Sequence, residues 1–274
     1  MTALSRWLSV STTMALGILS LCSLDAPASG TTLVMQTDEL KYDSVKIAQT
    51  LTFRFTTRYI EFHYSKAFAE LDTIKALAET YDRFCDDAIR ELALIPPSSR
   101  IRCFAYSSGD EMRQCLGIDG GGWAIIDEIH TLGLFPIQHE CFHILFNGAV
   151  GHPKSAFFIE GIGQYFELTR DTQMVSRDLT IVRKYLDQPI ESWANGTKGF
   201  WDSPQDGWIT VTYSISGMFV RHLIQKFGLN RFKDFYRTID DNATTTIADG
   251  FKRVYGSSLH EFINDFSNQM RSSP

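Results

Sequence analysis

The chain has 274 residues, of which 44% are hydrophobic, 21% charged and 13% aromatic, and its formal net charge is −6. This balance is typical of a globular protein and argues against a coiled coil, a collagen-like chain or a disordered chain. The acidic balance and the lack of a run of Lys or Arg argue against a nucleic-acid partner, because phosphate backbones are bound by basic surfaces.

Residues 1–28 have the three-part pattern of a secretory signal peptide. Arg6 supplies a positive charge, residues 8–24 are mostly apolar and small, and Ala26-Pro27-Ala28 resembles a cleavage site. We expect cleavage at the end of this motif, and therefore a secreted or periplasmic protein with no stable membrane span. The alternative is an uncleaved N-terminal membrane anchor, because the apolar stretch is nearly long enough to cross a bilayer.

Removal of the signal peptide would leave Cys85, Cys103, Cys115 and Cys141, an even number that permits disulfide bonds in an exported protein. Cys103 and Cys115 are the favoured pair because they are close in the sequence. Cys141 falls inside a helical motif, so we expect it to be a buried thiol.

The first half of the chain alternates between strand and helix patterns. Residues 57–64 alternate and are rich in aromatic and β-branched side chains, which predicts a strand. Apolar residues at helical spacing predict a long amphipathic helix over 66–93, which Pro96-Pro97 ends. A second strand is expected over 100–106, and a third begins at 123–126 after a run of glycines.

From Pro136 onward almost all of the sequence has the pattern of helices joined by polar loops, with a longer aromatic-containing polar loop over 189–212. We therefore predict an α+β fold in which residues 29–274 form a single domain. A small mixed lobe of strands and a helix, about 45–135, is followed by a mostly helical lobe, about 136–274.

His139-Glu140-Cys141-Phe142-His143 is an H-E-x-x-H motif in a helical context. Residues four apart lie on one face of a helix, so both imidazoles can bind one ion. Zinc accepts neutral imidazole ligands at about 2.0–2.1 Å. Glu140, beside the first ligand, can take a proton from water that the ion has activated. Because the pattern also arises by chance, the prediction depends on a third ligand.

We expect the third ligand on a second helix, which begins near residue 156. Glu160 lies among apolar residues there, and a buried unpaired carboxylate is costly, so a metal beside the two histidines would give it a partner. Gly161 leaves room for close packing against the first helix. The alternatives are His152, which lies in a Gly-His-Pro turn, and Glu167, which lies roughly 10 Å further along the second helix.

The pentad and the Glu-Gly-x-x-x-Tyr-x-Glu pattern that begins at Glu160 resemble the gluzincin metallopeptidases, and most of all the peptidase MA-like group related to aminopeptidase N and thermolysin. The resemblance implies a zincin-like fold with one Zn²⁺ between the two lobes. It also implies that Glu140 is the general base and that Glu167 orients a ligand histidine through its other ring nitrogen. The zinc ligands that it implies are His139, His143 and Glu160.

The segment from Tyr213 to Gly228 is similar to a tyrosine-led helix of the same family. The resemblance implies that Tyr213 hydrogen-bonds the tetrahedral intermediate, and the alternative is a tyrosine that packs in the core at the start of a helix. The family's Gly-x-Met-Glu-Asn motif, which holds the substrate amine, is missing. Gly122 and Trp123 occupy a similar place upstream, where an extended strand could pair with the substrate backbone.

The leading hypothesis is an exported zinc-dependent peptidase, with a peptide or protein as substrate, in which Glu140 moves a proton from water to the leaving amine. The alternative is a zinc-binding module of the same fold that functions in binding or assembly without catalysis. A third hypothesis assigns carbohydrate binding to the aromatic side chains of residues 189–212, although aromatics more often pack against each other. These aromatics are Trp193, Phe200, Trp201 and Trp208. The oligomeric state stays open.

Overall fold

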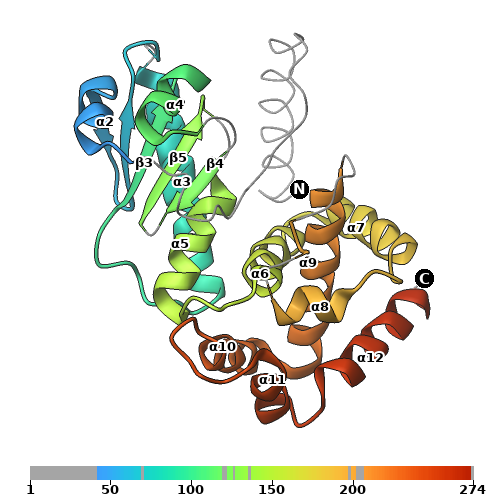
Figure 1. Ribbon diagram of the computed structural model, residues 1–274. Helices are drawn as coiled ribbons and strands as arrows, with labels where there is room; N and C mark the ends of the chain where they lie inside the picture. Colours follow the sequence, from blue (N-terminus) through green and yellow to red (C-terminus); the bar gives the residue numbers. More distant parts are fainter. Residues whose placement is uncertain are drawn as a thin grey trace, which may run out of the picture. The chain divides into compact units, whose positions relative to one another are not determined.

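A computed structural model describes residues 42–68, 71–118, 122–125, 127–134, 137–196, 199–201 and 207–272. The predicted signal peptide, residues 1–28, lies outside these ranges. Within them the protein combines one sheet with a larger number of helices, so the predicted α+β class is confirmed (Figure 1).

The described strands form one five-stranded sheet in the order β1-β2-β3-β5-β4. The three inner strands run parallel to one another, and each edge strand pairs antiparallel with its neighbour. Because β4 is an edge strand, one side of its backbone is not paired within the sheet. The strands are β1 (Phe53–Thr56), β2 (Ile60–Tyr64), β3 (Ile101–Tyr106), β4 (Gly122–Ile125) and β5 (Glu128–Leu132).

The two faces of the sheet have separate cores, because successive residues of a strand point to opposite faces. Cys103 of β3 faces the larger core, whereas its neighbour Phe104 belongs to a smaller core that includes Cys115 of α4 (Gly109–Leu116). Both thiols are free and buried, so the predicted Cys103–Cys115 disulfide is wrong. Cys141 is a buried free thiol, as predicted.

The predicted strand over 57–64 is shorter than expected, because its first residues form a turn. The backbone N–H of Thr57 donates to the carbonyl of Ile60 at 2.9 Å, and this turn joins β1 to β2. The predicted strands at 100–106 and from residue 123 correspond to β3 and β4. Four elements were not predicted from the sequence: β1, β5, α4 and α2 (Ser44–Thr50).

The long helix predicted over 66–93 is α3 (Leu71–Glu91). It ends where Ala93 adopts a positive φ of 46°. The ammonium group of Lys233 donates to the carbonyls of Leu92 and Ala93 at this end, so a residue from far along the chain caps the helix. The buried side chains of α3 recur at helical spacing, as expected: Ile74, Ala78, Tyr81, Cys85 and Ala88.

The rest of the described chain is helical, as predicted. Part of the expected 189–212 loop is instead helix, and the rings of Trp193 and Trp208 pack there with their centroids 5.5 Å apart. The helices are α5 (Gln138–Val150), α6 (Ala156–Leu168), α7 (Thr172–Lys184), α8 (Ile190–Asn195), α9 (Trp208–Phe227), α10 (Leu229–Thr238), α11 (Ile247–Tyr255) and α12 (Leu259–Ser272).

Helices α6 and α9 lie side by side and approach closely (Figure 1). A Cβ atom placed on Gly161 would lie 2.8 Å from the backbone oxygen of Ser216 and 2.8 Å from Val220 Cγ2, both on α9. Gly161 therefore permits the contact between α6 and α9. The prediction that it serves packing against the first helix of the motif, α5, is wrong.

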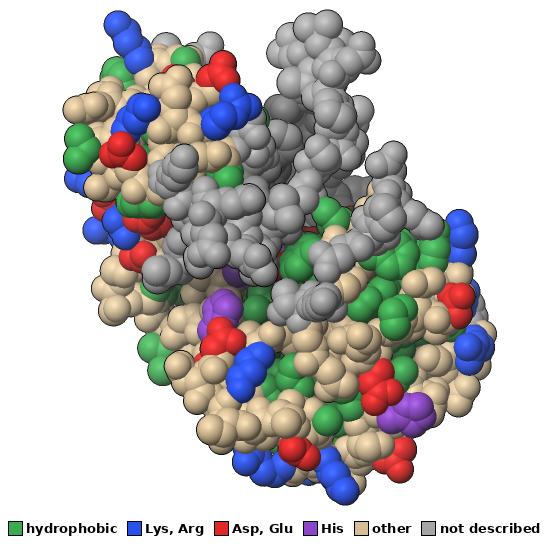
Figure 2. Space-filling view, viewed as in Figure 1, with side chains coloured by type: hydrophobic (Ala, Val, Ile, Leu, Met, Phe, Trp, Pro, Cys, Tyr) green, Lys and Arg blue, Asp and Glu red, His purple; other side chains and the backbone are tan. Residues whose placement is uncertain are grey.

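The surface of the described residues carries charges of both signs. On the face shown in Figure 2, basic and acidic side chains are interspersed, and neither sign gathers into a large patch. Among the described helices, none combines the length and the apolar character that crossing a membrane requires.

Candidate metal centre

The two histidines of the pentad lie on one face of α5, one helical turn apart. Their ring centroids are 4.5 Å apart, and the rings are nearly perpendicular at 86°. The start of the helix is held by α3, because the hydroxyl of Tyr81 accepts a hydrogen bond from the backbone N–H of Ile137 at 3.3 Å. The spacing of the motif therefore brings both imidazoles to the same point, as the sequence predicts.

The carboxylate of Glu160 on α6 lies between these imidazoles. Its Oε2 atom is 3.0 Å from Nε2 of His139 and 3.2 Å from Nε2 of His143. Ligand atoms of the three residues all lie within 4.8 Å of one another, and no other cluster of this kind was found among the described residues. Two imidazole nitrogens and a carboxylate oxygen are a common ligand set for a catalytic zinc ion.

The charges of this group are strongly coupled. Burial raises the pKa of Glu160, but the two imidazoles lower it by more, so the net pKa lies well below the usual range. Burial lowers the pKa of His139, whereas the carboxylates of Glu160 and Glu167 raise it by more, and the net pKa lies well above the usual range. The buried carboxylate therefore favours a positive charge beside it, which a proton or a divalent cation can supply.

Gly163 gives the imidazoles their space. A Cβ atom at this position would lie 2.8 Å from Cε1 of His139 and 3.2 Å from Cε1 of His143. A side chain here would therefore displace at least one ring. Gly163 was not predicted to belong to the site. A second glycine in a buried helix is nevertheless a signal in the sequence, since glycine costs about 1 kcal/mol relative to alanine in a helix interior.

Glu167 contacts the opposite side of the first histidine. Its Oε1 atom is 3.2 Å from Nδ1 of His139, while Nε2 of the same ring faces Glu160. This arrangement agrees with the predicted orienting contact through the other ring nitrogen. Nδ1 of His143, by contrast, is buried and has no hydrogen-bond partner among the described residues.

Glu140 lies against the edge strand of the sheet. A Cβ on Gly122 of β4 would lie 3.7 Å from Cγ of Glu140, which is ordinary van der Waals contact, so this position of the strand faces the Glu140 side chain. Burial raises the pKa of Glu140, and the two histidines and a backbone hydrogen bond from Ala124 oppose this only in part. Oε2 of Glu140 is buried and has no hydrogen-bond partner among the described residues.

Tyr213, in the second turn of α9, lies beside the ring of the first histidine. The centroids of the Tyr213 and His139 rings are 5.5 Å apart at an angle of 33°. The ring of Trp201 also lies near Tyr213, with the two ring centroids 6.0 Å apart. Trp193 and Phe200 are almost completely buried, at 2% and 0% exposed, which favours packing over carbohydrate binding for these two aromatics.

The structure separates His152 from this group. His152 lies on the surface, where its Nδ1 is 2.9 Å from Oδ2 of Asp241. Its backbone N–H donates to Asp240 at 2.8 Å, so it belongs to a surface turn. Trp123 pairs through its backbone with His130. The side chain of Trp123 is outside the described part of the structure, so its predicted role in substrate binding stays a prediction.

No model of a known protein family matches this chain, and no curated protein matches its sequence. The resemblance to the gluzincins therefore depends on the motif residues and on their geometry. In that geometry α5 supplies two imidazoles and an acidic side chain, α6 supplies two carboxylates, and α9 supplies a tyrosine.

Proposed function

We propose that this protein is an exported zinc-dependent peptidase of the gluzincin type, with a zincin-like fold. The observation that carries the proposal is the convergence of Nε2 of His139 and Nε2 of His143 on one buried oxygen of Glu160, at 3.0 and 3.2 Å. Oε2 of Glu140 has no hydrogen-bond partner among the described residues, and an acidic side chain of this kind beside the group argues against a closed structural zinc site.

The chain's residues fit a zinc ion by their chemistry. Three ligands of the His, His, Glu type leave a fourth position open for water or substrate. The missing side chain at Gly163 leaves the imidazoles free to point at Glu160. When bound, zinc would polarise the scissile carbonyl and lower the pKa of water toward about 7.

Glu140 would act as the general base and then as the general acid. Its carboxylate accepts a proton from the attacking water and returns it to the leaving amine. Burial raises the pKa of this carboxyl, and a raised pKa suits a group that must both accept and release a proton near neutral pH. The backbone of Ala124 contacts the carboxylate, so the edge strand would hold Glu140 in position.

Two further residues have supporting roles in this proposal. Glu167 would fix the orientation of His139 through Nδ1, which leaves Nε2 to face the ion. Tyr213, whose ring centroid lies 5.5 Å from that of His139, would donate a hydrogen bond to the oxyanion that forms during hydrolysis. A substrate backbone would lie along the unpaired side of β4, near Gly122.

The proposal is tested by incubating purified chain with a mixed peptide library, with zinc and with a chelator. We expect cleavage that the chelator abolishes and zinc restores. In E140Q, cleavage should fall by about 10²- to 10⁴-fold, the usual contribution of general acid–base catalysis, while the zinc content and the thermal unfolding temperature stay unchanged. Full zinc binding without cleavage under any metal regime would instead support the non-catalytic module.

A further inference from the structure

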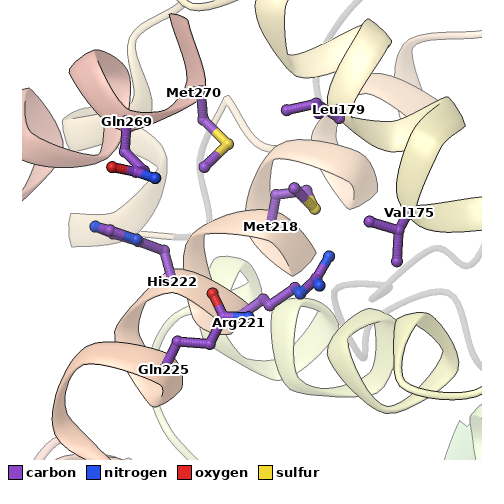
Figure 3. A pocket seen from close by; sticks show the side chains of 8 residues that line it. All are labelled: Val175, Leu179, Met218, Arg221, His222, Gln225, Gln269 and Met270. Carbon is purple, nitrogen blue, oxygen red and sulfur yellow. The ribbon is translucent and has the colours of Figure 1, made fainter. Parts of the chain in front are cut away.

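A hollow of about 250 Å³ lies between α7, α9 and α12, and none of its lining residues comes from α5 or α6 (Figure 3). It is separate from the candidate metal centre in its residues and in its chemistry. Val175, Leu179, Met218 and Met270 form its apolar part, and Arg221, His222, Gln225 and Gln269 form its polar part.

The apolar part of the hollow is lined by two methionines and by two aliphatic side chains of α7. Met218 and Met270, each 5% exposed, come from different helices, and both line the hollow in Figure 3. Val175 and Leu179 of α7 are partly buried beside them. Methionine adapts its shape to irregular apolar ligands, so this part of the hollow suits a short aliphatic chain.

Arg221 supplies a positive charge to the hollow. Its side chain is half-buried, and no carboxylate of the described residues forms an ion pair with it. In Figure 3 its guanidinium extends along the hollow toward Val175. A partly desolvated guanidinium binds carboxylates well, because its planar donors match the two oxygens.

The charged groups around the hollow are positive in balance. Among the described residues near the lining, the carboxylate of Asp265 is already engaged by His222 at 2.9 Å and by Lys226 at 2.8 Å, and that of Asp178 on α7 is engaged by Arg177 at 2.8 Å and by Gln164 at 2.7 Å. Arg183 of α7 donates to the backbone oxygen of Met270 at 3.0 Å, which brings a second guanidinium close to the hollow. In a chain with a net charge of −6, this local excess of positive charge favours an anion.

We propose that this hollow is a binding site for a small carboxylate with a short aliphatic chain. The carboxylate would pair with Arg221 and the aliphatic chain would lie on Met218 and Met270. The volume of about 250 Å³ lies just below the range of about 300–1,000 Å³ for drug-sized ligands, so the ligand is small. The proposal does not depend on the peptidase activity. Such a carboxylate is found both in free short-chain acids and at the C-terminus of a peptide that ends in an aliphatic residue.

The test uses the full chain with ¹³C-labelled methionine methyl groups, titrated with hexanoate and with the uncharged hexanamide. The methyl signals of Met218 and Met270 should shift with hexanoate. Because a hydrogen bond to a charged group contributes about 1.5–3 kcal/mol, hexanoate should bind about 10- to 100-fold more tightly than hexanamide. N-acetylleucine, which imitates a peptide C-terminus, is the third probe. Tighter binding of N-acetylleucine would indicate a peptide C-terminus as the natural ligand, and tighter binding of hexanoate a free short-chain acid. Either result supports the proposal.

The variant R221Q should lose most of the preference for hexanoate over hexanamide. R253Q is the matched control, because Arg253 is an exposed arginine on α11 outside the hollow. The R253Q variant should bind hexanoate with the same affinity as the parent. Unmoved Met218 and Met270 signals, or equal affinities for hexanoate and hexanamide in the parent chain, would overturn the proposal. The comparison of hexanoate with hexanamide uses the parent chain alone. It therefore tests the proposal even if R221Q fails to fold.

Discussion

Gly161 and Gly163 lie two residues apart on α6 and face different neighbours. A Cβ on Gly161 would meet the backbone of Ser216 at 2.8 Å, whereas a Cβ on Gly163 would meet Cε1 of His139 at the same 2.8 Å. The sequence indicates that a helix with two glycines approaches something closely. It does not indicate which glycine faces which neighbour, because that depends on how α6 is rotated between α5 and α9.

The two glycines give a matched pair of substitutions. G163A should weaken zinc binding with little change in stability, because the imidazoles must move away from the new methyl group. G161A should lower the free energy of unfolding by about 1–3 kcal/mol, the usual cost of overpacking, because backbone cannot move aside cheaply. Zinc titration and urea unfolding of both variants are the measurements. The reverse pattern would show that Gly163 is not part of the site.

At the residue scale the sequence predicts the local part of the site best. His139, Glu140 and His143 lie within one helix, so their common face follows from helical periodicity alone. Glu160 can reach the two histidines only if the chain turns back after α5. It was predicted to be a ligand because a buried carboxylate without a partner is costly. The contact between Ala124 and Glu140 was not predicted, because it depends on the position of the sheet edge relative to α5.

Among the elements, β5 shows why some strands were missed. Glu128 and His130 of this strand are buried at 6% and 0% exposure, although both are polar. Nε2 of His130 forms a hydrogen bond with Oε2 of Glu128 at 3.2 Å. Arg102 of the neighbouring strand forms an ion pair with Glu128 at 2.7 Å. A strand whose buried residues are ionisable does not show the apolar alternation by which strands are predicted.

The end of α3 depends on a residue that the sequence does not connect with it. Lys233 of α10 is 6% exposed and donates to the carbonyls of Leu92 and Ala93. K233M should lower the free energy of unfolding by about 1–3 kcal/mol, because it removes the donor to the buried carbonyl oxygen of Leu92. Urea unfolding measures this, with the exposed Lys252 as control: K252M should change stability by no more than about 0.5 kcal/mol. Equal effects of the two substitutions would contradict the capping role.

At the scale of the whole molecule, His130 links stability to pH. Burial lowers the pKa of His130, and its contact with Glu128 opposes this only in part. Both contacts of the ring suit its neutral form. The hydroxyl of Tyr106 can donate to Nδ1 at 3.0 Å, and the carboxylate of Glu128 can accept from Nε2 at 3.2 Å. Below about pH 6.5 the unfolded chain therefore binds a proton here that the folded chain does not, and stability falls as the pH falls.

The expected slope is about 1.4 kcal/mol of unfolding free energy per pH unit, from about pH 6.5 down to the folded pKa of His130. H130Q should lose this slope, whatever its stability at neutral pH. Urea unfolding of both proteins at about pH 7.5 and about pH 5.5 makes the comparison. A parent and a variant with the same pH dependence would show that His130 does not titrate as the structure indicates.

One core cluster connects the sheet, the α5–α6 pair and the C-terminal helices of the described chain. The sequence predicts the order of a strand-rich part and a helical part, because periodicity is a local property. It does not predict that Phe142 of α5 packs on Phe166 of α6 with ring centroids 4.8 Å apart. Such contacts between distant segments hold α5 and α6 together. The local sequence pattern cannot predict them.

We expect His139, His143 and Glu160 to hold one metal ion together. Zinc bound per chain after equilibrium dialysis, measured by elemental analysis in the parent and in three variants, tests it most directly. We predict one zinc ion per parent chain, loss of tight binding in E160A, and binding weakened by about 10- to 100-fold in E167A, as is usual when a partner of a ligand histidine is removed. H152A should bind zinc as the parent does, because His152 pairs with Asp241 at the surface. Release of the metal by H152A but not by E160A would contradict the account.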